Sequence, residues 1–354
     1  MSFSPTIAVT ALNATDNPGP GVGVIRALRA DPEFDGRIVG LAYDGLEPGI
    51  YTKDLVDDVY LIPYPSQGKD ALQARLEQVQ AKTPLDVLIP NLDAELPVFA
   101  DLEGWMREQG IGTFLPSREQ LDLRSKANLV ELGARAKIAT PATRIVSSPD
   151  ELYQIEDHVE FPLWVKGVYY GARRATNVHE AIAGFHEMAS KWGLPVIVQA
   201  EVKGDEIDVV ALGDGEGGLV GAVPMRKTYL TDKGKGWAGV AIRDQELFDL
   251  TERFFAATRW RGPCEVEMVR SPQGLSLLEI NPRFPAWCYL SAGAGMNLPA
   301  ALARLAAGMH VAPMRDYEAG MMFVRIALDQ IAPMSEFEAI ATHGELHRSR
   351  EQAP

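Results

Sequence analysis

Residues 262–284 read GPCEVEMVRSPQGLSLLEINPRF, and this stretch is the most informative part of the 354-residue chain. Two strand-like apolar runs flank Pro272, Gln273 and Gly274, which have the composition of a three-residue turn with glycine where a positive φ is wanted. The pattern predicts a β-hairpin centred on Gln273. In that register Glu267 lies directly opposite Glu279.

The predicted hairpin carries the elements of a metal site. Asn281 lies two residues beyond Glu279 and shares its face, because side chains alternate along a strand. Facing glutamates repel each other, and an isolated pair of this kind is usually a solvated surface. Glu279, however, lies within the apolar run LSLLEINPRF, where a carboxylate needs a partner. We therefore predict that Glu267, Glu279 and Asn281 bind a hard cation, Mg²⁺ or Mn²⁺.

The string E-I-N-P-R at residues 279–283, with an acidic residue on the preceding strand, resembles the magnesium motif of the ATP-grasp superfamily. The resemblance implies that the ions held by Glu267, Glu279 and Asn281 bridge the phosphates of ATP. It also implies a catalytic role for Arg283, whose planar guanidinium suits a transferred phosphoryl group or an acyl phosphate.

Two upstream lysines match the ATP-binding lysines of the superfamily in the expected order. Lys126 lies in RSKANLVELGARAKIATPATRI, and by itself it would be interpreted as an exposed helix lysine. Lys166 ends the apolar run FPLWVKG, where a charge needs a reason that a phosphate supplies. The resemblance implies that both lysines bind ATP.

The stretch VIVQAEVKGDEIDVV at residues 196–210 resembles the strand and hinge that bind adenine and ribose. The resemblance assigns backbone groups of Glu201 and Val202 to adenine and the side chain of Glu206 to ribose. Ala200 stands where the superfamily often has an acidic or glutamine side chain, so recognition of the adenine amino group would rest on the backbone.

The loop GVYYGARRAT at residues 167–176 has fewer glycines than the phosphate-covering loop of the superfamily. Its backbone amides would therefore approach a triphosphate less closely. Arg173 or Arg174 could compensate electrostatically, or both could be solvated surface charges.

A competing motif lies near the N-terminus. Gly19, Gly21 and Gly23 follow a strand-like run, and Asp44 closes the next one, as in a dinucleotide-binding fold. Read from Gly21, however, the pattern G-x-G-x-x-G places Arg26 at the last glycine. We therefore expect no nicotinamide cofactor.

The chain alternates strand-like and helical patterns up to about residue 115, which predicts a mostly parallel sheet, and later becomes rich in strands and hairpin turns. With the resemblance, this gives an α/β and α+β protein with a Rossmann-like pre-ATP-grasp domain and a two-subdomain ATP-grasp fold. We place the domain at 1–115, the subdomains at 116–198 and 199–310, and a C-terminal extension at 311–354. The extension holds one strand-like run, MMFVRIAL, and a polar tail after Gly344.

Composition limits the partners and the compartment. The 34 basic and 48 acidic residues give a formal net charge of -14, which disfavours nucleic acid and anionic membrane surfaces. Two cysteines, with no export signal or membrane-spanning run, favour the cytoplasm. A homodimer is compatible with the sequence, but nothing in the sequence proves one.

These features predict an ADP-forming ligase that activates a carboxylate as an acyl phosphate and joins it to an amine, such as that of an amino acid or peptide. The alternatives are a catalytically silent nucleotide-binding regulator and a phosphorylating enzyme similar to carbamoyl-phosphate synthase, although the chain has a single ATP-grasp unit. A nicotinamide-dependent oxidoreductase is a third alternative. Candidate substrate contacts, each also compatible with a core or surface role, are Arg226, Lys227, Trp287, Cys288 and Tyr289.

Overall fold

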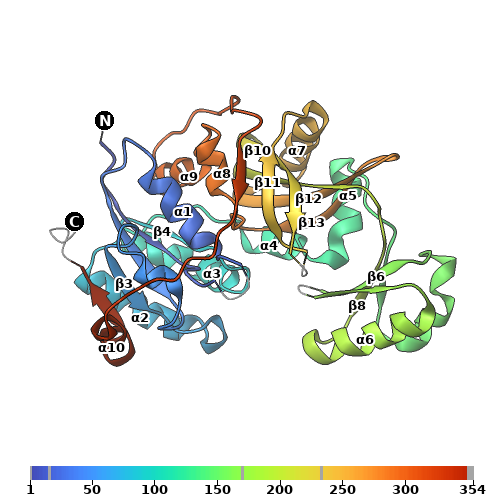
Figure 1. Ribbon diagram of the computed structural model, residues 1–354, viewed down its shortest axis with the longest axis horizontal. Coiled ribbons are helices and arrows are strands. Elements are labelled where there is room, and N and C mark those ends of the chain that lie inside the picture. The colour runs from blue at the N-terminus through green and yellow to red at the C-terminus, as the bar shows by residue number, and fades with distance from the viewer. Residues whose placement is uncertain (1, 15–16, 169–170, 232–233, 349–354) are drawn as a thin grey trace.

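The computed structural model describes residues 2–14, 17–168, 171–231 and 234–348. Its strands form three sheets of five, four and six strands (Figure 1). The first sheet lies at the left of Figure 1, the six-stranded sheet at the top and the four-stranded sheet at the lower right. Within the described ranges, no helix is long and apolar enough to cross a membrane.

The five-stranded sheet has the order β15-β3-β2-β1-β4. Strands β1 to β4 are parallel, which confirms the sheet predicted from the alternating pattern. These strands are β1 (Thr6–Val9), β2 (Arg37–Ala42), β3 (Asp58–Leu61) and β4 (Val87–Ile89). The helices between them are α1 (Pro20–Arg29), η1 (Pro48–Tyr51), η2 (Pro65–Gln67) and α2 (Lys69–Lys82), and α3 (Leu96–Glu108) follows β4.

Short helices connect this sheet to the rest of the chain. They are α4 (Arg118–Leu123), η3 (Lys126–Asn128) and α5 (Leu129–Ala136). Oγ of Ser117 accepts a hydrogen bond from the backbone N–H of Gln120, and Oε1 of Gln120 accepts one from the backbone N–H of Ser117. This reciprocal capping box fixes where α4 begins.

The four-stranded antiparallel sheet has the order β5-β8-β6-β7 and a hydrophobic core of its own. Its strands are β5 (Thr143–Val146), β6 (Leu163–Gly167), β7 (Ala172–Ala175) and β8 (Val196–Ala200). Two helices, η4 (Pro149–Asp157) and α6 (Val178–Trp192), contribute residues to the same core.

The six-stranded antiparallel sheet has the order β13-β12-β9-β10-β11-β14. Its strands are β9 (Asp205–Asp214), β10 (Leu219–Leu230), β11 (Gly236–Ala241), β12 (Arg261–Ser271), β13 (Gly274–Asn281) and β14 (Met322–Val324). Helices α5 and α7 (Gln245–Thr258) share a core with one part of the sheet. Helices α8 (Tyr289–Gly293) and α9 (Leu298–Ala306) join the sheet to α1 and the first sheet in another core.

The β12–β13 hairpin differs from the predicted one in its turn. Ser271 pairs with Gly274, so the turn has two residues, not three, and Gly274 has a φ of +114°. An irregularity next to Glu267 adds one residue on β13, so that Met268 pairs with Leu277 while Glu267 pairs with Glu279. The shorter turn and this bulge compensate each other, and the predicted pairing of Glu267 with Glu279 is confirmed.

The C-terminal segment returns to the first sheet. After β14, an extended stretch leads to α10 (Met334–His343) and β15 (Glu345–His347), which pairs antiparallel with β3. The strand-like run at 321–328 thus forms a strand over three residues, and the polar tail after Gly344 begins with a strand. The proposed division of the chain at residues 115, 198 and 310 stays a prediction.

Candidate active site

The hairpin brings together the three predicted metal ligands. Asn281 on β13 lies opposite Glu265 on β12, two pairs along from Glu267 and Glu279 and on the same face. Its Nδ2 donates hydrogen bonds to Oε1 of Glu267 at 2.7 Å and to Oε2 of Glu265 at 3.0 Å. Glu265 is buried and was missed from the sequence, although it shares the face of Glu267 two residues away.

Both predicted ATP-binding lysines face this cluster. Lys126 of η3 is buried, and its Nζ lies 3.2 Å from Oε1 of Glu279. Lys166 of β6 donates a hydrogen bond to Oε1 of Gln199 at 2.6 Å. Burial, with a smaller contribution from Lys126, lowers the pKa of Lys166 to about 8. The interpretation of Lys126 as an exposed helix lysine is therefore wrong, because the side chain turns inward to a carboxylate.

A third lysine connects the carboxylates of β9 and β12. Nζ of Lys227 lies 3.1 Å from Glu206, 3.1 Å from Asp208 and 3.6 Å from Glu267. Burial, and then Glu267, raise the pKa of Asp208 well above its ordinary value, and its Oδ1 has no hydrogen-bond partner among the described residues. Asp208 was missed, although it follows Glu206 by two residues on one strand face. Burial alone would lower the pKa of Lys227, but the surrounding carboxylates outweigh it and raise that pKa.

Arg283 is held by carboxylates from two different sheets. Its Nε lies 2.9 Å from Oδ2 of Asp93, in the loop after β4, and its Nη1 lies 3.5 Å from Oε2 of Glu265. Arg124 lies 3.2 Å from the other oxygen of Asp93. Trp287 donates a hydrogen bond from Nε1 to Oε1 of Glu265 at 2.7 Å. The first sheet therefore contributes to the site through Asp93, a residue that no local pattern identified.

Comparisons with known proteins place this geometry in a known fold. Residues 194–327 match the family described as ATP-grasp in the biosynthetic pathway with Ter operon. A comparison with curated proteins found no match.

Among solved structures, the biotin carboxylase domain of Hydrogenobacter thermophilus 2-oxoglutarate carboxylase is 18% identical, with a TM-score of 0.68 over 90% of this chain and 72% of that chain. An L-amino acid ligase from Bacillus licheniformis is 13% identical, with a TM-score of 0.65 over 87% and 75%. The chain has the ATP-grasp fold. A biotin carboxylase from Campylobacter jejuni agrees, at 14% identity and a TM-score of 0.69 over 90% and 73% of the chains.

The segment expected to bind adenine lies directly after β8 of the ATP-grasp fold. The backbone N–H of Glu201 donates to the carbonyl oxygen of Pro162 at 3.2 Å, so this one of the groups expected to contact adenine already has a partner. The carboxylate of Glu201 pairs with Nε of Arg174 at 2.5 Å. Arg174 thus ties the β6–β7 hairpin to the hinge.

Arg173 lies on the same β6–β7 hairpin, and its Nη1 is 3.1 Å from Oε2 of Glu187 on α6. Like Arg174, it therefore has a carboxylate partner of its own. Tyr169 and Tyr170 of the glycine-poor loop lie outside the described residues.

The donor set of the hairpin fits a hard divalent cation. It consists of carboxylate and amide oxygens, and Asn281 contacts the glutamates through its nitrogen and not through its Oδ1. Within the described ranges, no three Asp, Glu, His or Cys side chains form a ready-made metal cage. Mg²⁺ does not require one, because it usually takes one or two carboxylates and completes its shell with phosphates and water.

The N-terminal glycines are explained by packing. A Cβ on Gly21 would lie 1.9 Å from the carbonyl oxygen of Thr10, and one on Gly19 would lie 2.4 Å from that of Ala11. A Cβ on Gly23 would lie 3.1 Å from Sγ of Cys288. Burial raises the pKa of Cys288 to about 12, which is typical of a packed thiol and not of a nucleophile.

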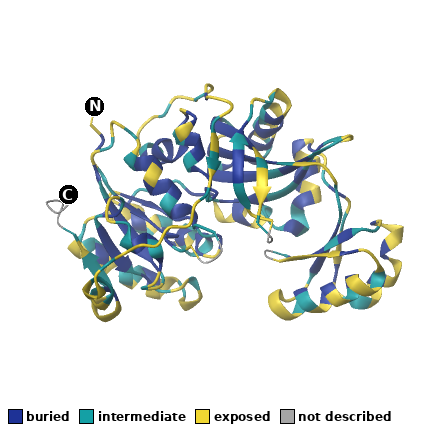
Figure 2. Ribbon diagram, viewed as in Figure 1, coloured by how far each residue is buried: buried dark blue, intermediate teal, exposed yellow. Residues whose placement is uncertain are grey.

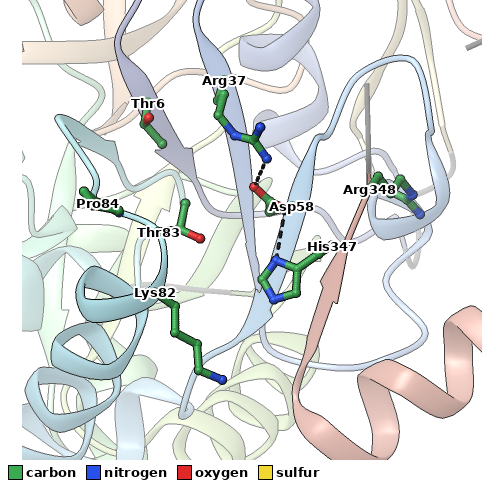
Figure 3. A pocket seen from close by; sticks show the side chains of 8 residues that line it. All are labelled: Thr6, Arg37, Asp58, Lys82, Thr83, Pro84, His347 and Arg348. Atoms are coloured by element: carbon green, nitrogen blue, oxygen red, sulfur yellow. Dashed lines mark hydrogen bonds and ion pairs between the residues drawn. The ribbon is translucent and has the colours of Figure 1, made fainter. Parts of the chain in front are cut away.

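A separate pocket of about 460 Å³ lies at the opposite edge of the first sheet (Figure 3). Its basic side chains already have acidic partners: Arg37 pairs with Asp58 at 2.5 Å, and Lys82 pairs with Glu345 at 2.6 Å. It is lined by residues at the amino ends of the strands and by the C-terminal strand, and none of the predicted site residues belongs to it.

Proposed function

We propose that this protein is an ATP-dependent, ADP-forming ligase that activates a carboxylate as an acyl phosphate and joins it to an amine, with an amino acid or a peptide as the favoured class. The observation that carries the proposal is the pairing of Glu267 with Glu279 beside Asn281, with Nζ of Lys126 3.2 Å from Glu279. Such a cluster of carboxylates and ammonium groups suits the binding of a metal–triphosphate complex.

The nucleotide would lie between the four-stranded and six-stranded sheets. Lys126 and Lys166 would bind its phosphates, the hinge at Glu201 and Val202 its adenine, and Glu206 its ribose. Mg²⁺, held by Glu267, Glu279 and Asn281, would supply positive charge to the phosphates. In the structure Lys126 and Lys227 neutralise these carboxylates, so a bound cation would compete with both ammonium groups.

The reaction would have two steps. A carboxylate oxygen of the substrate attacks the γ-phosphorus, and the bond between that phosphorus and the β,γ-bridging oxygen breaks to release ADP. An amine nitrogen then attacks the acyl carbon, phosphate leaves with the electron pair of the C–O bond, and the nitrogen loses a proton. Arg283 would stabilise the phosphoryl group and the acyl phosphate, since its guanidinium is positioned by Asp93 and Glu265.

Several findings support this proposal. Solved structures with the same fold include an L-amino acid ligase and the ADP complex of N5-carboxyaminoimidazole ribonucleotide synthetase. The biotin carboxylase domain of Hydrogenobacter thermophilus was solved with ADP and magnesium. We place the protein in the cytoplasm, which agrees with Cys264 and Cys288 being free, buried thiols.

The test is ADP release from Mg-ATP across a panel of amino acids and small carboxylic acids, with hydroxylamine present to trap an acyl phosphate as a hydroxamate. We expect carboxylate-dependent ADP and a matching hydroxamate. Glu279→Gln, which keeps the size of the side chain and removes its charge, should lower the rate on the order of 100-fold or more while the thermal unfolding transition stays cooperative. Formation of AMP would contradict the mechanism, and ATP binding without turnover over the whole panel would favour a regulatory protein.

A further inference from the structure

The chain from β14 to the first residue of α10 presents a row of exposed apolar side chains, which we call the apolar strap. Each of its members is between 58% and 87% exposed. Figure 1 shows this red segment crossing from the six-stranded sheet to α10, and Figure 2 shows long exposed stretches along it. The apolar strap consists of Met322, Val324, Ile326, Leu328, Ile331 and Met334.

The first part of the strap has strand periodicity. Met322, Val324, Ile326 and Leu328 alternate with other residues, so they share one face of an extended chain. Tyr229 pairs with Ala238, and Ala238 pairs with Val324, so the exposed ring of Tyr229 continues this face across the sheet. The apolar surface therefore extends onto β10 and is not confined to a loop.

The strap is also an open edge of the sheet. Within the described ranges β14 pairs only with β11, which leaves its outer backbone groups available to another strand. An exposed, apolar edge strand is a template for pairing with a further chain. The six side chains expose on the order of 700 Å² in total, above the roughly 300–600 Å² of the largest apolar patch on a typical monomer.

We propose that the apolar strap is the interface of a homodimer, in which β14 of one copy pairs antiparallel with β14 of a second copy across a two-fold axis. Such an interface uses the same patch twice, and an antiparallel edge meets this condition. The exposed area is close to the roughly 800 Å² per partner of a stable interface.

Charge favours a second copy as the occupant. The whole chain carries a formal net charge of -14, so most faces of two copies repel each other. Residues 322–334 contain one cation, Arg325, and one anion, Asp329, and are therefore neutral. The strap is a surface at which two copies can approach without like-charge repulsion.

The opposite face of the strap leads to the candidate active site. Arg325 lies between the outward-facing Val324 and Ile326, and its Nε is buried without a hydrogen-bond partner in the described part of the chain. Burial lowers its pKa to about 10, opposed by Cys288 and by Glu265 of the site. Pairing of β14 across the two-fold axis would therefore order the backbone that holds Arg325 near Glu265, a consequence that rests on the proposed function.

The test measures the mass of the full-length protein by light scattering and sedimentation velocity over a concentration series. We expect twice the monomer mass of 38.7 kDa. The double variant Met322→Lys and Val324→Lys should be monomeric, with dimer affinity weakened at least 100-fold. Met322 of each copy would face Val324 of the other across the axis, so four lysines would meet there. The change brings the formal net charge from -14 only to -12, so stronger overall repulsion cannot be the cause.

The matched control is Tyr153→Lys, which changes an equally exposed apolar side chain on η4 and should leave the dimer intact. A wild-type protein that is monomeric throughout the series would overturn the proposal. A double variant that stays dimeric, or a control that dissociates equally, would place the interface elsewhere or show a general effect of charge. None of these readouts requires ligase activity.

A second variant guards against misfolding of the first. Val324→Cys adds an exposed thiol next to the axis, in a chain whose own cysteines are both buried. A short bis-maleimide should join two copies of this variant, and should not join copies of Tyr153→Cys. Absence of the cross-linked dimer at concentrations where the protein is dimeric would overturn the assignment of the strap.

Discussion

Nucleotide affinity should depend on pH through Lys166. Burial, and then the neighbouring ammonium of Lys126, lower the pKa of Lys166 from 10.5 to about 8, against the opposing effect of Glu279 and Glu267. Its Nζ also donates to Oε1 of Gln199. Phosphates favour the ammonium form of Lys166. Above pH 8 this lysine is mostly neutral in the free protein, so it must take up a proton when the nucleotide binds.

The magnitude follows from this shift. Each pH unit above about 8 should cost ~1.4 kcal/mol of binding free energy, or about a tenfold loss in affinity, until the pKa of the complex is reached. Affinity for Mg-ATP should therefore be about 30-fold weaker at pH 9.5 than at pH 7. The charge of ATP itself does not change in this range, because phosphates lose their last proton near pH ~6.

Isothermal titration calorimetry at several pH values, in buffers with different ionisation enthalpies, measures both affinity and proton uptake. Wild-type protein should take up about three quarters of a proton per nucleotide at pH 8.5. Lys166→Arg keeps its charge at every pH used and should bind without this dependence, whereas Lys166→Met should bind weakly at every pH. Constant wild-type affinity from pH 7 to 9.5, or an equal pH dependence in Lys166→Arg, would refute the assignment of this lysine.

Two further predictions concern stability. Trp287→Phe removes the donor at 2.7 Å from the buried Glu265, and it should lower the free energy of unfolding by ~1–3 kcal/mol. Urea denaturation measures this loss, and an unchanged midpoint would show that the hydrogen bond contributes nothing net. Ending the chain at residue 333 removes α10, β15 and the fully buried Ile340, and it should lower the free energy of unfolding by at least ~2 kcal/mol. A truncated protein with unchanged thermal unfolding would contradict a structural role for the returning segment.

The features that could be predicted from the sequence depend on short-range rules. The pairing of Glu267 with Glu279 was predicted because strand pairing and side-chain alternation act over a few residues. The capping box of Ser117 and Gln120 spans one helical turn. The hairpin nevertheless shows the limit of such rules, because the length of its turn was wrong and the bulge on β13 compensated for it.

Other parts of the site were decided by the tertiary structure. Asp93 and Arg283 are 190 residues apart in the sequence and meet only because the first sheet packs beside the six-stranded sheet. Lys227 reaches Asp208 and Glu267 because β9 lies between β10 and β12. No local spacing encodes either contact.

The amino-acid sequence alone therefore determined which carboxylates face each other on the hairpin, since strand geometry is set by neighbouring residues. The charge balance around them was decided by the tertiary structure. Burial changes the pKa of each buried group, and the opposite charge that compensates for it comes from a distant strand or loop whose position depends on how the sheets pack.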